Sequence, residues 1–347
     1  MTLETSKNAK GISEAIPNDA ALPALTLLSR PAELVAILSS LLVKRLRAKR
    51  QVVDCCVKVL RHVPGKRCIV EFKLKIESEE SGVTESQNLI GKFYANGHGQ
   101  KVFTTLQDLQ SSGFGDGRLA VSEPLAYDPH WQLLLLGHSK GDLLRNLILA
   151  QSNLEGVLEG GAEWLAKLHR CGIKSGRRYS LHDHLGALEA RKNALEQASP
   201  DAARRFGEVL AQIGKQLEKI EERTLGPTHR DFSPDHLLVD GARITGLDFD
   251  EFCQYDRVFD VAHFIAHVRY LGLLHSSSLH VFDPLAERFS ATYQSYAGIE
   301  SLVRLEPYLA LAYLKLAQIV ALVTRPNGWQ GMTDTILAEA QQFSQVK

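Results

Sequence analysis

The rhythm of hydrophobic and polar positions changes once along this chain. Between Val52 and Tyr94, short runs rich in β-branched and aromatic residues alternate with polar turns, which is typical of strands. From Gly141 onward, apolar residues recur at the spacing of amphipathic helices. The pattern therefore predicts an α+β fold with two lobes, a small β-rich one followed by a larger, mainly helical one.

The small lobe is expected to contain helices as well as strands. Pro31 favours a helix start, and apolar residues follow it at helical spacing through Leu46. We expect strands at 55–60, 68–76, 89–94 and 132–136, and a second helix at 99–110. Because residues 1–22 are polar, we assign 1–25 to a mobile N-terminal tail and 26–136 to the small lobe.

The large lobe, 137–347, is predicted to be helical apart from one hairpin. Helices are expected near 142–150, 153–171, 182–196, 200–223, 257–274, 281–296, 305–324 and 332–343. The most apolar stretch, 308–323, contains Lys315 and Gln318 and is too short to span a bilayer. We therefore expect a buried helix there.

The hairpin is the most informative feature of the sequence. Asp240-Gly241 lies between the apolar runs 236–239 and 243–247, and Asp-Gly is a strong signal for a tight turn. A turn at these two residues would pair Val239 with Ala242. Asp231 and Asp248 would then converge at the open end of the hairpin. Carboxylates held together favour a metal ion, a shared proton or both.

Composition favours a small-molecule partner. Lys plus Arg equals Asp plus Glu at 40 each, so nothing global favours nucleic acid or an anionic membrane. Hydrophobic residues make up 44% of the chain, enough for a full core. The cysteines lack metal-ligand spacing apart from the adjacent Cys55 and Cys56, and residues 1–22 show no signal peptide. We therefore expect a reduced, cytoplasmic protein.

Four motifs in a plausible order carry a resemblance to a known family. They are His229-Arg230-Asp231, Asp248-Phe249-Asp250, the run Phe259–Phe264 that holds Asp260, and Lys92 in its strand. Together they resemble the protein-kinase-like aminoglycoside and choline phosphotransferase family over roughly 50–325. The segment 164–169 also looks like the family's helix after the connector. The resemblance implies transfer of a phosphoryl group from ATP, with Mg²⁺, to a small-molecule hydroxyl.

The resemblance also implies roles for individual residues. Asp231 would accept or orient the hydroxyl proton, and its alternative role is that of a turn-capping aspartate. Asp248 would hold Mg²⁺, since hard cations prefer carboxylate oxygens. Lys92 would reach the nucleotide phosphates, although a strand lysine can also simply point to solvent.

Supporting roles follow from the same resemblance. His229 and Asp260 would hold the loop that carries Asp231. The connector Gly137-His138-Ser139 would receive adenine through its backbone. The turn at Gly65 and Lys66 would cover the phosphates, but it has one glycine and reads equally well as an ordinary β-turn.

The sequence departs from the family pattern at two places. His236 stands where the family has a metal-ligating Asn, and Asp235 is the residue that would supply the missing oxygen. The helix at 99–110 offers no Glu to pair with Lys92. In its place are Gln100, Gln107 and Asp108. These departures leave two readings open, an active enzyme with an altered metal site and an impaired nucleotide-binding protein.

A further rival is a metal-dependent phosphohydrolase. His263 and His267 are four residues apart on a predicted helix and, with the aspartates, offer metal ligands, although such pairs usually just pack. The acceptor stays open among amino alcohols, sugars and aminoglycoside-like molecules. The carboxylates after the metal position would either attract a cationic or polyhydroxy acceptor or be solvated. These are Asp250, Glu251 and Asp256.

Overall fold

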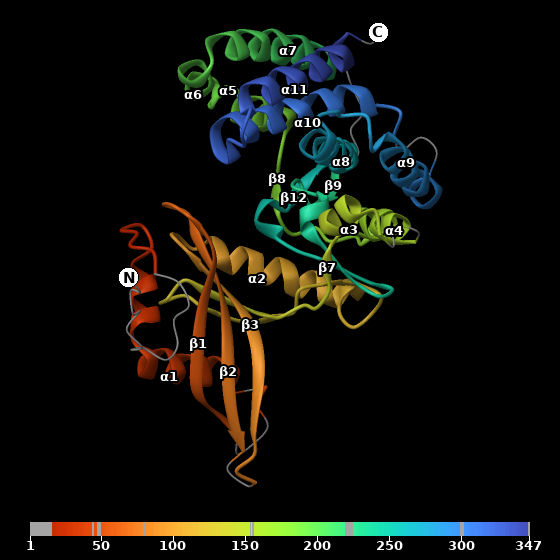
Figure 1. Ribbon diagram of the computed structural model, residues 1–347. Helices are drawn as coiled ribbons and strands as arrows, with labels where there is room; N and C mark the ends of the chain where they lie inside the picture. Colours follow the sequence, from red (N-terminus) through yellow and green to blue (C-terminus); the bar gives the residue numbers. More distant parts are fainter. Residues whose placement is uncertain are drawn as a thin grey trace, which may run out of the picture. The chain divides into compact units, whose positions relative to one another are not determined.

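The computed structural model describes the chain in two compact units (Figure 1). The described residues are 16–43, 45–46, 50–78, 81–152, 154, 156–218, 225–298 and 302–345. One unit comprises Met1–Gln110 and Val121–Ser139, and the other comprises Ser111–Ala120 and Lys140–Lys347. The division follows Ser139 rather than residue 136, and the short segment Ser111–Ala120 joins the second unit.

The first unit is built on a five-stranded antiparallel sheet in the order β1-β2-β3-β6-β5. Its strands are β1 (Arg50–Val63), β2 (Arg67–Ser78), β3 (Thr84–Tyr94), β5 (Pro124–Asp128) and β6 (Leu133–Gly137). The predicted strands are all present, but β1 and β3 are longer than the apolar runs that indicated them. Their extra residues pair through the backbone, which places no demand on hydrophobicity.

Alternation along the strands gives this sheet one strongly apolar face. Phe72 and Leu74 of β2 and Leu89 and Phe93 of β3 are fully buried in one core with α1 (Pro31–Leu42). A 3₁₀ helix, Pro23–Ser29, precedes α1 and contributes buried leucines to the same core.

The mobile tail predicted over residues 1–25 overlaps the described residues at its C-terminal end. Residues 1–15 lie outside the described residues, but Leu22 and Leu25 are 1% and 2% exposed. The prediction of a tail through residue 25 is therefore wrong at its C-terminal end. Burial of these leucines against the sheet outweighs the polar character of the residues before them.

The opposite face of the sheet carries Lys92. Leu89, Gly91 and Phe93 face the α1 core, so Ile90, Lys92 and Tyr94 face the other side. The second helix of this unit, α2 (His98–Leu109), packs there, with His98 in ring contact with Tyr94. Lys92 is only 6% exposed.

The second unit is mainly helical, as predicted (Figure 1). Its helices are α3 (Leu144–Ala150), α4 (Val157–Arg170), α5 (Leu181–Glu189), α6 (Lys192–Ala198), α7 (Pro200–Glu218), α8 (Val258–Ser276), α9 (Asp283–Ala297), α10 (Leu305–Ile319) and α11 (Trp329–Ser344). The helix predicted over 182–196 is two helices, and part of the one predicted over 200–223 lies outside the described residues.

Helix α10 is central and contacts α7, α8 and α11. With its π-helical end it forms the segment Leu305–Thr324, which is long and apolar enough for a membrane span, but 67% of that window is buried inside the protein. The prediction of a buried helix is thus confirmed.

Two small sheets interrupt the helices of the second unit. One has the order β4-β11-β10-β7 and the other the order β8-β12-β9. Their strands are β4 (Leu119–Val121), β7 (Asp142–Leu143), β8 (Arg177–Arg178), β9 (Leu225–Thr228), β10 (Leu237–Asp240), β11 (Arg243–Gly246) and β12 (Cys253–Asp256). The prediction that the hairpin is the only β-structure here was wrong, because strands of two to four residues are too short to show alternation.

The hairpin itself is present with a shifted turn. Asp240 pairs with Arg243, so the loop is Gly241-Ala242, and Val239 faces Ile244 rather than Ala242. Gly241 has φ +57° and supplies the left-handed conformation. A shift of two positions leaves every side chain on its predicted face, so Asp231 and Asp248 still meet.

Candidate active site

The loop before the hairpin is fastened by one buried carboxylate. Asp260 of α8 is fully buried and accepts hydrogen bonds from the backbone N–H groups of His229 and Arg230, both at 2.7 Å. Its Oδ2 lies 3.1 Å from Nε2 of His169, whose Nδ1 lies 2.7 Å from the hydroxyl of Tyr293. Three groups thus contact the two oxygens of this carboxylate, which fixes the loop in one conformation.

Aromatic packing supports the same loop from below. Nε2 of the fully buried His229 donates to the carbonyl of Leu247 at 2.8 Å, which joins the loop to the strand after the turn. Trp164 of α4 stacks on Phe232 at 5.6 Å between ring centroids and donates from Nε1 to the carbonyl of Ala120. Burial lowers the pKa of His229, so its ring is neutral and serves packing and orientation.

Two non-glycine residues beside the acidic positions have left-handed backbone conformations. Arg230 has φ +65° and Asp248 has φ +58°. The Arg230 guanidinium lies 3.7 Å from the ring centre of Tyr179 and donates to Glu251 at 3.0 Å. Such conformations cost about 1–2 kcal/mol each and persist where the surroundings enforce them, as is common at functional sites.

Asp231 lies in a cationic environment. Nζ of Lys315, from α10, donates to its Oδ1 at 2.7 Å, and Nε2 of His263 is 3.6 Å from the same oxygen. Burial alone would raise the pKa of Asp231, but the Lys315 ammonium, together with the two neighbouring histidines, holds it well below its usual range. Asp231 is therefore ionised, with its side chain 31% exposed.

His236 lies between Asp231 and Asp248. Its Nδ1 donates to the backbone carbonyl of Asp231 at 2.7 Å, because a carbonyl oxygen can only accept. Its Nε2 lies 3.8 Å from Oδ2 of Asp248. In the neutral ring this nitrogen carries a lone pair, so the structure brings together one nitrogen and one carboxylate that suit a divalent cation.

Asp235, the other predicted metal ligand, has a different partner. Its Oδ1 accepts from Nη1 of Arg145 on α3 at 2.9 Å. Among the described residues, no three His, Cys, Asp or Glu side chains gather as a metal-binding group. A cation here would thus take two protein ligands, which is how Mg²⁺ is commonly held when phosphate oxygens complete the shell.

The three residues that replace the expected Glu of α2 differ in exposure. Gln100 and Gln107 are exposed, and Asp108 is partly buried. Lys92 is buried in the sheet, so the alternative in which it simply points to solvent is wrong. A buried ammonium requires compensation by negative charge or polar groups.

The turn between β1 and β2 has a structural partner. The Gly65 N–H donates to Oδ2 of Asp19 at 2.8 Å, and His62 contacts the same oxygen at 2.8 Å. The backbone N–H of Lys66 donates to the carbonyl of Val63 and closes the turn. The Gly65 amide already has a carboxylate acceptor, so the geometry adds no support for a phosphate cover at this turn.

The predicted connector follows directly from β6. The Gly137 N–H donates to the carbonyl of Glu123 at 2.8 Å, and Nε2 of His138 lies 3.5 Å from Glu71. Ser139 is the last residue of the first unit. The backbone of His138 and Ser139 forms no regular structure.

In the histidine pair of α8, His263 is buried and His267 is partly buried. His263 donates from Nδ1 to the carbonyl of Phe232 at 2.9 Å, and its ring lies 4.4 Å from that of His267. Burial lowers the pKa of both, to about 4 for His267. The pair packs beneath the loop, as helix pairs of this spacing usually do.

Lys315 contacts Asp231 and was not among the site residues predicted from the sequence. The signal was present, since a lysine in an otherwise apolar helix must send its ammonium to a polar partner. The partner could not be identified without the packing of α10 on α8.

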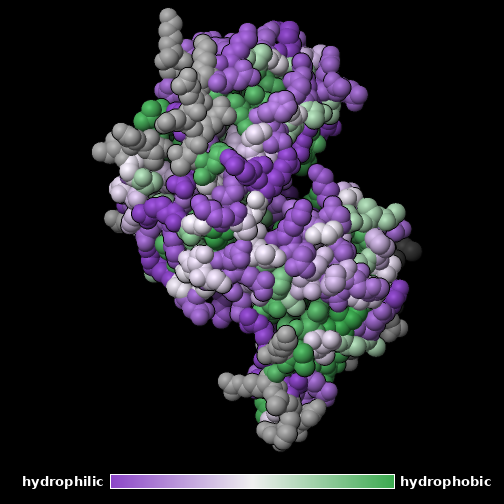
Figure 2. Space-filling model, turned by 180° about the vertical axis from the view of Figure 1, so that it is seen from behind, coloured by the Kyte–Doolittle hydropathy of each residue, from purple (hydrophilic) through white to green (hydrophobic). Residues whose placement is uncertain are grey.

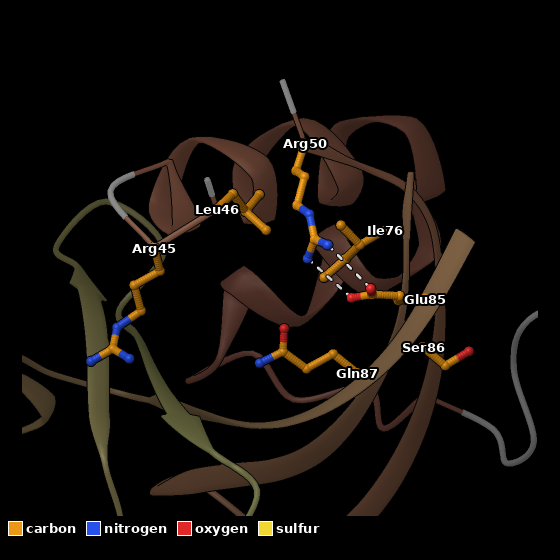
Figure 3. A pocket seen from close by; sticks show the side chains of 7 residues that line it. All are labelled: Arg45, Leu46, Arg50, Ile76, Glu85, Ser86 and Gln87. Atoms are coloured by element: carbon orange, nitrogen blue, oxygen red, sulfur yellow. Dashed lines mark hydrogen bonds and ion pairs between the residues drawn. The ribbon is translucent and has the colours of Figure 1, made fainter. Parts of the chain in front are cut away.

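A separate pocket of about 290 Å³ opens in the first unit (Figure 3). Arg50 binds both carboxylate oxygens of Glu85, at 3.0 and 3.1 Å, and closes one side. The predicted site residues are not among its lining, which consists of Arg45, Leu46, Arg50, Ile76, Glu85, Ser86 and Gln87.

Figure 2 shows hydrophobic residues gathered over the lower part of the molecule in that view.

Comparison with known proteins assigns the fold and the family. Residues 84–302 match the model of a family described as phosphotransferase enzymes. No curated protein sequence matches the chain.

Solved structures share the fold at low identity. A protein from Ralstonia eutropha, named as a candidate aminoglycoside phosphotransferase, aligns with a TM-score of 0.63 and 10% identity over 89% of this chain and 97% of its own. Plasmodium vivax ethanolamine kinase aligns with a TM-score of 0.57 and 12% identity over 83% and 81%. A thermostable aminoglycoside phosphotransferase mutant, in complex with ADP and hygromycin B, aligns with a TM-score of 0.56 and 14% identity over 88% and 97%.

Proposed function

The chain belongs to the phosphotransferase enzyme family and is a small-molecule phosphotransferase with a kinase-like fold, and we propose that it transfers the γ-phosphoryl group of ATP to a hydroxyl. The observation that carries the proposal is the meeting of Asp231, His236 and Asp248 beside one braced loop. This arrangement offers a base, a cation site and a fixed backbone, which are the parts that phosphoryl transfer requires. Of the similar structures, one is a complex with ADP and hygromycin B, and another is named an ethanolamine kinase.

Asp231 is the proposed base. Its Oδ2 receives no hydrogen bond from the described residues, so it can accept one from an acceptor hydroxyl. As the hydroxyl oxygen forms its bond to phosphorus, its proton moves toward Asp231, and ADP leaves with the electron pair of the broken bond. Because the pKa of Asp231 is lowered, its carboxylate is a weak base. Its main role is therefore to orient the hydroxyl, and the proton transfers late in the reaction.

Asp248 and His236 are the proposed cation ligands. A divalent cation bound there would neutralise charge on the nucleotide phosphates. Because Arg145 engages Asp235, the nitrogen of His236 is the more accessible partner for the cation, and Asp235 orients Arg145. We propose Mg²⁺ as the physiological ion, with Mn²⁺ a better fit to a mixed nitrogen and oxygen pair.

The nucleotide would be held by residues of the first unit. Lys92 is proposed for the phosphates and the backbone of 137–139 for adenine. His229 and Asp260 keep the loop in place. All five cysteines are unpaired, and we place the protein in the cytoplasm, where thiols stay reduced and ATP is available.

A catalytically impaired nucleotide-binding protein is the second candidate. Two features favour this candidate. Lys315 forms an ion pair with Asp231, and His236 stands in place of the expected Asn. A phosphohydrolase gains less support, because burial and packing account for His263 and His267.

Asp231→Asn tests the proposal. We expect wild-type protein with ATP and Mg²⁺ to phosphorylate members of a pooled hydroxyl panel, detected as new phosphomonoester signals by ³¹P NMR. The variant should lose at least about 10²-fold in rate, the usual contribution of a general base, while nucleotide affinity stays unchanged. Equal rates in both proteins would remove Asp231 from the chemistry. Nucleotide binding without transfer by the wild type would support the impaired protein.

A further inference from the structure

A fixed ammonium lies beside the proposed base. Nζ of Lys315 donates to Oδ1 of Asp231 at 2.7 Å and to the carbonyl of Arg230 at 3.0 Å, and the side chain is 18% exposed. Its neighbours on α10 are fully buried apolar residues, so the stem is fixed by packing and the ammonium has a defined position. Any acceptor that reaches Asp231 also meets this charge.

Three carboxylates near the loop are matched by cations or donors. Glu251 pairs with Arg230 at 3.0 Å, and Asp235 pairs with Arg145 at 2.9 Å. Asp256 is buried and accepts from the hydroxyl of Tyr308 at 2.7 Å, with Arg304 at 3.4 Å. These contacts occupy Glu251 and Asp256, two of the three carboxylates that the sequence offered as attractors of a cationic acceptor.

The histidines that face Asp231 contribute no negative charge to the site. His263 presents Nε2 to Oδ1 of Asp231 at 3.6 Å, and that nitrogen is buried without a hydrogen-bond partner among the described residues. His267 lies directly behind it. Neither side chain can offset Lys315, because a neutral imidazole carries no negative charge.

We infer that Lys315 is a specificity-determining residue and that the acceptor carries an anionic group next to its reacting hydroxyl. The inference rests on the proposed phosphotransfer at Asp231. The hydroxyl would donate to Oδ2 of Asp231, while a carboxylate or phosphate of the same molecule would accept from Nζ of Lys315. Hydroxy acids and sugar acids meet this description. Amino alcohols place a second cation against Lys315, which disfavours them.

A matched set of three-carbon probes tests the inference. Glycerate, glycerol and 3-amino-1,2-propanediol share a skeleton and differ in charge. Their binding to the complex with a non-hydrolysable ATP analogue is measured by saturation-transfer NMR, which detects weak ligands. We expect glycerate to bind most tightly and the amine most weakly, with a difference on the order of 10²-fold, since a like-charge contact is costly.

Variants identify the residue responsible. Lys315→Gln should remove the preference for glycerate, and Lys315→Arg should keep it. The control Lys192→Gln removes a charge from an exposed pair with Glu189 and should change nothing. Preference for the amine, equal or absent binding of all three probes, or an unaltered preference in Lys315→Gln would overturn the inference.

The proposed function is assessed separately in the same samples. Binding of the ATP analogue is recorded before the probes are added. Charge discrimination without any phosphoryl transfer from ATP would count against the proposed function alone. Transfer from ATP to the amine faster than to glycerate would count against the role of Lys315 alone.

Discussion

Two turns in this molecule are each held by an aspartate that accepts backbone N–H groups, and they differ in what they support. In the first unit, Asp19 holds Gly65, which has φ +71°, and the following Lys66 is exposed. In the second unit, the buried Asp260 holds Arg230, which has φ +65°, and the following residue is Asp231.

The difference lies in burial and strain. Glycine adopts a positive φ without cost, so the first turn needs little support. An arginine in the same conformation must be held there by its surroundings, which here include Asp260, Tyr179 and Glu251. The same local motif therefore closes an ordinary turn in one unit and fixes the loop that carries the proposed base in the other.

Removing the two anchoring carboxylates should show this difference most clearly. Asp260→Ala leaves two buried backbone donors and His169 without an acceptor, which costs at least about 3 kcal/mol of unfolding free energy. Asp19→Ala should lower stability less, because its turn is at the surface. Urea unfolding of both variants measures this. Equal losses would contradict the distinction between the turns.

Glycine-to-alanine substitutions compare how tightly the two regions are packed. A Cβ at Gly246 would collide with the buried ring of Trp164, so Gly246→Ala should cost about 1–3 kcal/mol and perturb the loop. A Cβ at Gly65 would meet open space, so the only cost of Gly65→Ala is that alanine disfavours a positive φ. This cost should be about 1 kcal/mol. Thermal unfolding and phosphoryl transfer are measured together. A loss of transfer confined to Gly65→Ala would reverse the assignment of roles.

Protonation of one histidine should affect the second region alone. His267 beneath the second turn has its pKa lowered by burial to about 4 from 6.5. The unfolded chain binds this proton first, so stability is full above pH 6.5 and falls as the pH drops toward 4. This residue alone contributes about 3 kcal/mol of that fall. His267→Gln should flatten the pH dependence of unfolding between pH 6.5 and 4, whereas His182→Gln, at an exposed site, should not.

Patterns within single segments predicted the fold and much of the site. Four strands of the five-stranded sheet, the buried α10 and the convergence of Asp231 with Asp248 follow from local alternation, apolar runs and the Asp-Gly turn signal, whereas β5 was not predicted. The family match over 84–302 confirms the resemblance drawn from the same motifs.

Contacts between distant segments could not be predicted in this way. Lys315 lies 84 positions from Asp231, and Arg145 lies 90 positions from Asp235. Asp19, in a stretch read as a mobile tail, holds a turn 46 positions away. Each pairing depends on how elements pack, which one sequence does not display.

We propose that His236 and Asp248 hold a nucleotide-bound cation beside Asp231. Pulsed electron paramagnetic resonance of Mn²⁺·ATP bound to the protein tests it most directly. We expect ³¹P couplings from ATP and a ¹⁴N coupling from an imidazole on the same ion. The nitrogen coupling should vanish in His236→Asn, and Asp248→Asn should weaken binding of the ion. Bound Mn²⁺·ATP with phosphorus couplings but no nitrogen coupling, unchanged in both variants, would contradict the account.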